Sequence, residues 1–323
     1  MPRGVKKIEE NSEITIESLL EKYASSLAAG SDEKWKFGRI AFGIPALDNL
    51  TGGGIPKKRI TLLTGSPNVG KSYVASQIAV RVQKAGGIVA WLDTEMSWDP
   101  AWMAKCGLEI DKVLLSQPII GEDAFSLVRD LLKDGIDLIV LDSVAGLVPS
   151  AIQDEDFSYN PMAWQARFIN QSLPRLMPFL KNGSALVLIN QTRSSMGPVS
   201  LSPMPGGQGQ VFFSHFIIQL SRSGWIEEGD KKKVGFDIDV IIRKSKVGGQ
   251  SFEKCTIPFR LDGGIDILET FIREALSKGI ITQAGPWYKI VDNDQKILGM
   301  NGLREYFSQN PDQFEILKNS VIA

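Results

Sequence analysis

Histidine and cysteine are scarce in this chain: its 323 residues include one histidine and two cysteines. The cysteines, Cys106 and Cys255, stand far apart in the sequence, which argues against a disulfide framework and for a reducing compartment. His215 is the one imidazole, so a metal site built from cysteine and histidine ligands is excluded.

Long apolar runs and excess charge are also missing. No apolar run reaches the roughly 18 residues that a membrane-spanning helix needs. The opening residues, MPRGVKKIEENSE, are too polar for a secretory signal. The formal net charge is −1, so a site for nucleic acid would depend on the local placement of lysine and arginine. We therefore expect a cytoplasmic globular protein with no membrane partner.

Hydrophobic periodicity divides the chain into three expected regions: 1–35, 36–264 and 265–323. In the first region, apolar residues follow one helical stripe over residues 14–29, and Gly30 can end that helix. The stripe consists of Ile16, Leu19, Leu20, Tyr23 and Leu27. A lone amphipathic helix must bury such a stripe, either on its own domain or on a neighbouring subunit.

The middle region alternates short β-like runs with helical stretches. Nearly continuous apolar strands between helices are typical of a parallel sheet covered on both faces, so we expect an α/β fold. The runs are residues 59–65, 87–93, 112–118, 137–142 and 184–191. Three later runs, 215–222, 234–246 and 253–260, are separated by turn-like pieces and should extend the sheet with antiparallel strands. Region 265–323 should form a small α+β domain with a helix ending at Gly279, a hairpin, and two helices broken at Asn310-Pro311.

The stretch LLTGSPNVGKS, residues 62–72, matches G-x-x-x-x-G-K-[ST] between an expected strand and an expected helix. In such a loop, backbone N–H groups and the helix N-terminus surround phosphate oxygens. Lys71 should reach the β- and γ-phosphates, and the Ser72 hydroxyl should bind Mg²⁺. The expected nucleotide-binding loop consists of Gly65, Ser66, Pro67, Asn68, Val69, Gly70, Lys71, Ser72 and Tyr73.

Polar residues follow the other expected parallel strands. Asp142 ends the run DLIVLD, where a nucleotide triphosphatase places an acidic residue that assists Mg²⁺ through water. Its alternative role is that of a helix cap. Asp93 ends the run 87–93 and Glu95 follows it, and Glu95 is our candidate for activating the attacking water. Asn190 and Gln191 end the run 184–191, where an amide could contact the γ-phosphate.

The order of these motifs resembles that of the RecA family of recombinases and, more distantly, that of the phage recombinase UvsX. The resemblance extends from residue 36 to the end of the chain. It is carried by FGIPALDNLTGGGIPKKRI, DTEMSWDPAWMAKCGLEIDKVLLSQP, LIVLDSVAGLVP and LINQTR. FRLDGGIDILETFIREALSKGIITQAGPWYKI extends it into the C-terminal region, which other P-loop ATPases lack. The resemblance implies a RecA-like ATPase core with an N-terminal oligomerisation helix.

The resemblance also implies roles at the ATP site. Glu95 corresponds to the water-activating glutamate, and Gln191 to the glutamine that senses the γ-phosphate and couples it to DNA. Asp99 and Trp102 fall where the family holds adenine, although Trp102 could instead serve in packing. Lys244 and Lys246 match lysines that reach the ATP of the neighbouring subunit.

Two DNA-binding loops are implied, at about residues 151–167 and 192–210. Arginines there should contact phosphates, methionines should wedge between bases, and glycines should let the backbone approach DNA closely. The implied DNA-binding residues are Met162, Arg167, Asn170, Arg193, Met196, Gly206 and Gly207.

The implied function is homologous recombination. ATP with Mg²⁺ would hold protomers in a helical filament on single-stranded DNA, through the N-terminal helix, with Phe212 transmitting ATP binding across the interface. The filament would then pair with homologous double-stranded DNA and exchange strands, with DNA-stimulated ATP hydrolysis. Single-strand-binding and mediator proteins are further expected partners. The alternatives are a ring-forming DNA motor and a non-catalytic recombination mediator.

Overall fold

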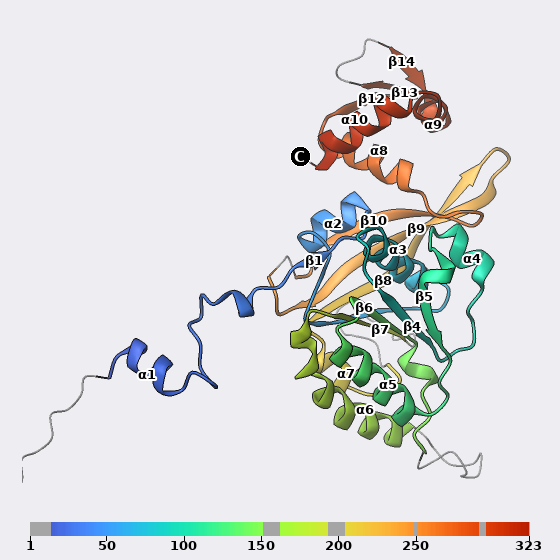
Figure 1. Cartoon of the computed structure of the whole chain (residues 1–323). Coiled ribbons are helices and arrows are strands. Elements are labelled where there is room, and N and C mark those ends of the chain that lie inside the picture. The colour runs from blue at the N-terminus through green and yellow to red at the C-terminus, as the bar shows by residue number, and fades with distance from the viewer. Residues whose placement is uncertain (1–13, 151–161, 193–203, 249–250, 291–294, 323) are drawn as a thin grey trace, which may run out of the picture. The chain divides into compact units, whose positions relative to one another are not determined.

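The computed structural model describes residues 14–150, 162–192, 204–248, 251–290 and 295–322. The chain divides into two compact units, Met1–Gly38 and Arg39–Ala323, which are considered separately here (Figure 1).

The N-terminal unit contains a short helix, α1 (Ile16–Lys22), and a single turn, η1 (Glu33–Trp35). Thr15 caps α1, because its side chain accepts a hydrogen bond from the Ser18 N–H at 3.1 Å. The predicted helix over residues 14–29 is too long: Tyr23 leaves the helical conformation, and the chain turns back through hydrogen bonds to the Tyr23 carbonyl. Ser25 and Ser26 follow at once, and serine favours turns over helix interiors. No residue of α1 is buried.

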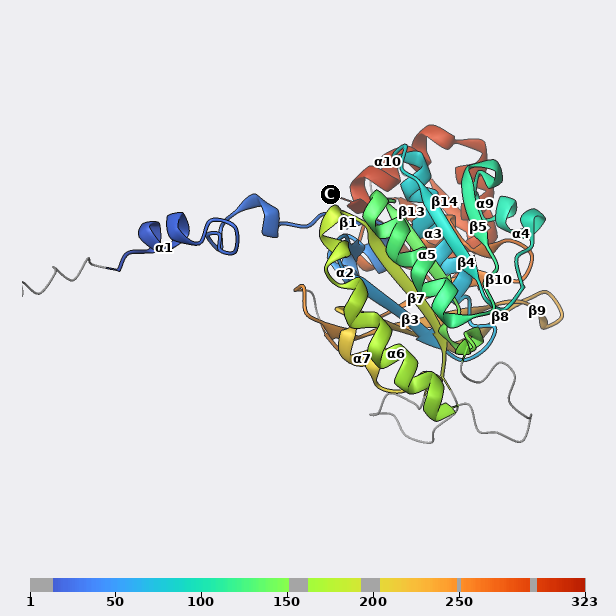
Figure 2. The same cartoon turned by 60° about the horizontal axis from the view of Figure 1, so that its bottom comes forward.

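Within the described residues of the larger unit, nine strands form one sheet in the order β11-β10-β9-β8-β3-β7-β6-β4-β5 (Figure 2). The strands β5, β4, β6, β7, β3 and β8 run parallel, and β9, β10 and β11 add antiparallel pairs. The predicted α/β fold with a mostly parallel sheet is therefore confirmed, as is its antiparallel extension. The strands are β3 (Ile60–Gly65), β4 (Val89–Asp93), β5 (Val113–Ser116), β6 (Leu138–Asp142), β7 (Ala185–Gln191), β8 (Phe216–Glu228), β9 (Lys232–Ser245), β10 (Lys254–Arg260) and β11 (Gly264–Ile265).

Side-chain alternation along the central strands divides the apolar residues between two cores. On β6, Leu138 and Val140 pack against α3 (Lys71–Lys84), whereas Ile139 and Leu141 pack against α5 (Gly121–Asp134) and α6 (Met162–Leu176). Both faces of the sheet are thus covered by helices, as Figures 1 and 2 show. This double burial explains why the strands read as continuous apolar runs rather than as alternating ones.

Shorter elements complete the main layer. They are β1 (Arg39–Ile40), α2 (Pro45–Thr51), β2 (Ile55–Pro56), α4 (Pro100–Lys105), η2 (Ile110–Lys112), η3 (Val144–Gly146), η5 (Phe179–Asn182) and α7 (Gly209–Phe213).

The C-terminal elements enclose a third apolar core. It lies among α8 (Ile267–Ser277), α9 (Gly299–Gln309), α10 (Pro311–Ile322) and a small antiparallel sheet of β12 (Ile281–Ala284), β13 (Trp287–Ile290) and β14 (Lys296–Leu298). Arg273 on α8 joins this layer to the main sheet through an ion pair with Asp237, at 2.8 Å. The predicted hairpin and paired helices are present, while the division of the chain at residue 265 stays a prediction. None of the helices in the described ranges is long and apolar enough to cross a bilayer.

We predict that Gly264→Ala destabilises the protein by about 2–3 kcal/mol, because its φ is +80° and an added Cβ would lie 1.9 Å from the Tyr73 ring. Gly279→Ala is the matched control: its φ is +73°, but nothing lies within 4 Å, so about 1 kcal/mol should be lost. Urea denaturation measures both. Equal losses would contradict the packing of Tyr73 against this glycine.

Candidate nucleotide-binding and catalytic site

The predicted polar residues converge because four parallel strands end at one edge of the sheet. Gly65 on β3 is in register with Gln191 on β7, and Asp93 on β4 is in register with Asp142 on β6. The order β3-β7-β6-β4 therefore brings the phosphate loop, the amide and both carboxylates to one rim. This is the rim where open α/β sheets bind their ligands.

The phosphate loop joins this edge to the N-terminus of α3. Gly70 caps α3 in a left-handed conformation, φ 89°, which favours glycine. At Gly65, an added Cβ would lie 2.3 Å from the Leu220 carbonyl oxygen, so β8 leaves no room for a side chain. Neighbouring residues thus fix the shape of the loop. The N-terminus of α3 follows it, and a helix N-terminus favours an anion such as phosphate.

Lys71 is almost fully buried in this loop. Its ammonium donates hydrogen bonds to the carbonyls of Ser66, at 2.8 Å, and Gly65, at 3.2 Å. Burial lowers the pKa of Lys71, and the negative charges of Asp142 and Glu95 partly offset that effect. A phosphate group would give this ammonium a far stronger acceptor than two neutral carbonyls.

Asp142 is also buried, and burial raises its pKa to about 6. A hydrogen bond from Ser72 and the charge of Lys71 lower that pKa, while Glu95 and Asp93 raise it. Above pH 6 the native state carries a charged carboxylate that burial disfavours. A cation next to Ser72 and Asp142 would relieve this cost.

Glu95 occupies the centre of a hydrogen-bonded set. Its Oε1 accepts a hydrogen bond from the Ser143 hydroxyl, at 2.5 Å, and one from the Gln191 amide, at 3.1 Å. The side chain nevertheless stays exposed on the rim of the cleft. An exposed carboxylate held by two fixed donors can orient a water molecule or accept its proton.

Asp93, the other carboxylate after β4, has a structural role. It is 1% exposed and accepts hydrogen bonds from the Glu95 N–H, the Trp98 N–H and the Gln117 amide, at 3.2, 2.9 and 3.0 Å. These bonds fix the loop that carries Glu95. The choice of Glu95 over Asp93 as the water-activating residue therefore has a geometric reason.

The cleft beside the loop has a volume of about 450 Å³ and an aromatic wall. Trp102 and Tyr73 line it, with ring centroids 6.3 Å apart, and Phe259 meets Tyr73 edge to face. Asp99 does not line this cleft: its carboxylate caps α4 by accepting from the Ala101 and Trp102 N–H groups. A role for Asp99 in holding adenine stays a prediction.

Lys244 and Lys246 do not line this cleft, and their ammonium groups bond to carbonyls of α7. The Lys244 ammonium donates to the carbonyls of Val211, at 2.5 Å, and Phe212, at 3.0 Å. Lys246 donates to the same Phe212 carbonyl, at 3.3 Å. Burial and the charge of Lys246 lower the pKa of Lys244 to about 8. Neither lysine lines its own chain's cleft, so a role at ATP would have to involve another protomer.

The predicted DNA-binding residues have different positions. Arg193 and Met196 lie outside the described residues, as does the side chain of Met162 at the start of α6. Arg167 and Asn170 are exposed on α6. Gly207 faces α6 closely, since an added Cβ would lie 2.8 Å from the Ala166 Cβ, and Gly206 is surrounded at 3.4–3.5 Å. The observed close approach of these glycines is to protein, and their contact with DNA stays a prediction.

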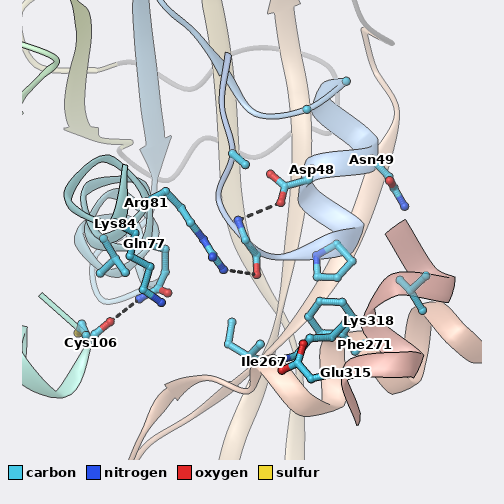
Figure 3. Close-up of a pocket in the computed structure, with 18 residues that line it drawn as sticks. Asp48, Asn49, Gln77, Arg81, Lys84, Cys106, Ile267, Phe271, Glu315 and Lys318 are labelled. Atoms are coloured by element: carbon cyan, nitrogen blue, oxygen red, sulfur yellow. Dashed lines mark hydrogen bonds and ion pairs between the residues drawn. The ribbon is translucent and has the colours of Figure 1, made fainter. Parts of the chain in front are cut away.

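A larger cavity of about 980 Å³ lies between α2, α3 and the C-terminal helices (Figure 3). It contains none of the predicted site residues. Its polar groups mostly bond locally: Asp48 accepts three backbone N–H groups, Gln77 donates to the Cys106 carbonyl, and Lys318 pairs with Glu315. The smaller cleft, with its convergent charged groups, is the better candidate site.

Comparison with known proteins agrees with this geometry. The model of the RecA N-terminal domain family matches residues 11–266. The chain belongs to the RecA family of recombinases. It is 33% identical to Protein RecA of Aquifex aeolicus over 90% of this chain and 85% of that protein. It is 31% identical to Protein RecA of Thermus aquaticus over 100% of this chain and 95% of that protein. It is 34% identical to Protein RecA of Lactobacillus johnsonii over 87% of this chain and 79% of that protein.

RecA-family proteins are DNA-dependent ATPases that use ATP and magnesium, associate with one another on DNA and exchange DNA strands. The recombinase prediction for this chain is thereby confirmed. The role of each site residue is a separate question, which the matches leave open.

Sequence reasoning missed one residue that lines this cleft and two that support the elements around it. Arg222 lines it, donates to the Asn68 carbonyl at 3.3 Å, and lies 4.3 Å from the Phe236 ring centroid. Ser143, which fixes Glu95, was missed although it directly follows Asp142. Gln165 on α6 was missed too, and its amide donates to the carbonyls of Ala145 and Leu147. A serine beside the strand-end aspartate was a usable signal, whereas Arg222 comes close only through the fold.

We expect Lys71→Ala to weaken binding of Mg²⁺–ATP by about 30- to 100-fold, because a charge-assisted bond to phosphate is lost. Lys84→Ala is the matched control, at the exposed far end of the same helix. Isothermal titration calorimetry measures both affinities. Unchanged binding by Lys71→Ala would remove this lysine from the site.

Proposed function

We propose that this RecA-family protein assembles on single-stranded DNA as a helical filament, with Mg²⁺–ATP captured between neighbouring protomers. The filament pairs its strand with homologous double-stranded DNA and exchanges strands. ATP hydrolysis, with Glu95 activating the water, weakens the filament and allows turnover. Base pairing supplies the sequence specificity, and the protein holds the DNA backbone.

The observation that carries the proposal is the contact between Glu95 and Gln191 beside the phosphate loop. Glu95 can accept a proton from water, and Gln191 can donate a hydrogen bond to a γ-phosphate oxygen. Because the two side chains bond to each other, a phosphate that engages Gln191 changes the surroundings of Glu95. One residue pair thus supports both the chemistry and its coupling to the segment that follows Gln191.

Magnesium fits the donors at this site. No cluster of three or more His, Cys, Asp or Glu able to hold a metal occurs among the described residues. Mg²⁺ usually binds one or two protein oxygens together with phosphates and water, so Ser72, with Asp142 assisting through water, suffices. The ion supplies neutralisation of the phosphate charge. Lys71 and the loop N–H groups hold the phosphates in position.

Filament formation is supported by two apolar surfaces. Ile16, Leu19, Tyr23 and Leu27 in the N-terminal unit are between 37% and 72% exposed, and a seven-residue helix is too short to be stable alone. In the larger unit, β5 is an edge strand among the described residues, and its Leu114 and Leu115 are 51% and 43% exposed. We assign the β5 edge of one protomer as the receiver of the N-terminal unit of the next.

Several finer assignments belong to the same proposal. Regions 1–35, 36–264 and 265–323 serve as docking arm, ATPase core and C-terminal domain. Trp102 stacks on adenine with Asp99 nearby, Lys244 and Lys246 approach the neighbour's ATP, and the segments 151–167 and 192–210 hold DNA. Single-strand-binding and mediator proteins are its partners, in the cytoplasm of a bacterial cell or a phage-infected host.

Strand exchange tests the proposed function. A circular single strand and a homologous linear duplex should yield joint molecules with the protein, Mg²⁺ and ATP, and none without ATP. Electron microscopy of the protein on single-stranded DNA should show helical filaments. Closed rings would favour a DNA motor, and nucleotide binding without joint molecules would favour a mediator.

Glu95→Gln should slow ATP hydrolysis by about 100-fold or more, because the amide keeps the shape of the side chain but cannot accept a proton. Affinities for ATP and DNA should change little, so filaments should persist after ATP is added. Phosphate release and DNA-binding anisotropy measure the two effects.

Glu109→Gln is the control for that variant, because Glu109 is exposed and forms an ion pair with Lys112, at 2.6 Å. Normal turnover by Glu95→Gln would defeat the assignment of Glu95.

Leu115→Asp should prevent ATP-dependent assembly, because it places a charge on the proposed receiving edge, while the monomer keeps its fold. Sedimentation velocity with Mg²⁺–ATP and an oligonucleotide measures assembly, and circular dichroism checks the fold. Leu298→Asp, at a site 57% exposed on the C-terminal sheet, should assemble as the wild type does. Normal assembly of both variants would rule out the β5 edge.

A further inference from the structure

The two ends of segment 193–203 are held together at the base of the phosphate loop. On the leading side, the Thr192 N–H donates to the Gly65 carbonyl at 3.0 Å, the same carbonyl that accepts from Lys71. On the trailing side, the Thr64 hydroxyl donates to the Met204 sulfur at 3.0 Å. Both ends therefore attach to the last two residues of β3, immediately before the loop expected to hold phosphate.

A buried pair of amide side chains connects these two ends directly. Asn190, the residue before Gln191, donates through Nδ2 to the Gln210 Oε1 at 2.7 Å and to the Pro205 carbonyl at 2.8 Å. Gln210 donates through Nε2 to the same Pro205 carbonyl at 2.5 Å and to the Gly207 carbonyl at 3.2 Å. Both residues are 0% exposed.

The pair is also bonded to Gln191, the residue expected to sense the γ-phosphate. The Oδ1 of Asn190 accepts from the Gln191 N–H at 2.8 Å. Every side-chain amide group of the pair is thus engaged. In a buried network of this kind, a shift at one bond must either move the whole set or leave a polar group unsatisfied.

The trailing end packs against α6, the helix that follows the other expected DNA-binding segment. An added Cβ at Gly207 would lie 2.8 Å from the Ala166 Cβ, and one at Gly209 would lie 2.1 Å from the Asn170 Oδ1. There is no room for a side chain at either glycine, so residues 207–209 pack closely on α6. A displacement of Gln210 therefore reaches α6, which begins directly after segment 151–161.

We propose that Gln210 is a positioning residue that, through its buried amide pair with Asn190, transmits the state of Gln191 to both DNA-binding segments. Gln210, at the end of segment 192–210, is fully buried and acts through Asn190 rather than by direct contact with DNA. It keeps the two ends of segment 193–203 at a fixed separation, so that a movement of Gln191 on phosphate binding becomes a movement of both ends. This inference rests on the proposed function, because it requires ATP and DNA to bind the same protomer.

The test compares Gln210→Ala with Gln313→Ala in the full-length protein. Gln313 is the matched control, because it has the same side chain, is exposed on α10 and lies outside both expected DNA-binding segments. Fluorescence anisotropy with a labelled oligothymidylate gives the DNA affinity in Mg²⁺–ATPγS and in Mg²⁺–ADP. The ratio of the two affinities measures the coupling. ATP affinity and the DNA-free hydrolysis rate are measured in parallel.

We expect Gln210→Ala to reduce the coupling ratio by about tenfold, while ATP affinity and DNA-free hydrolysis stay within about twofold of wild type. Gln313→Ala should keep the wild-type ratio. The inference is overturned if Gln210→Ala keeps the ratio, or if it loses ATP binding and coupling together, as a purely structural residue would. A wild-type protein whose DNA affinity is the same with both nucleotides would instead refute the proposed function.

Discussion

The hydrogen bond between the Glu95 carboxylate and the Gln191 amide links the chemical site to the rest of the molecule. It exists because β4 and β7 end at the same rim, separated in the sheet by β6. Around it, Asp93 fixes the loop of Glu95, Ser143 fixes the carboxylate, and Asn190 fixes the strand end that carries Gln191. The candidate catalytic group and the candidate sensing group are thereby held in one small network.

The network lies among charged groups of both signs, two of which are buried. Lys71 is buried against carbonyls, Asp142 is buried with a pKa raised to about 6, and Glu95 stays at the exposed rim. Burial disfavours the charged forms of Lys71 and Asp142, and under the proposed function Mg²⁺–ATP would supply a counterpart for both signs. The same logic applies at the surface, where α1 and the β5 edge expose apolar groups that a monomer leaves in water. These features are what the proposed function requires of a protomer that binds nucleotide and docks on its own copies.

Much of this was visible in the sequence. Continuous apolar strands predicted the parallel sheet because both of its faces are buried, and the loop before Lys71 has few alternatives once a strand and a helix flank it. Strand-end residues were predictable for the same reason, since parallel strands share a carboxyl edge. The length of α1 was not, because the apolar stripe continues past Lys22 while Ser25 and Ser26 favour a turn. Arg222, Gln165 and Gln210 could not be predicted, because each has a partner that is distant in the chain and a role that depends on tertiary contacts.

The central claim is that ATP bound at this network controls the grip of the assembled protein on DNA. The most direct measurement is the rate of ATP hydrolysis per protomer at increasing protein concentration, with and without single-stranded DNA. The account predicts a rate that rises strongly with DNA and cooperatively with protein concentration. A rate per protomer that is independent of both would contradict it.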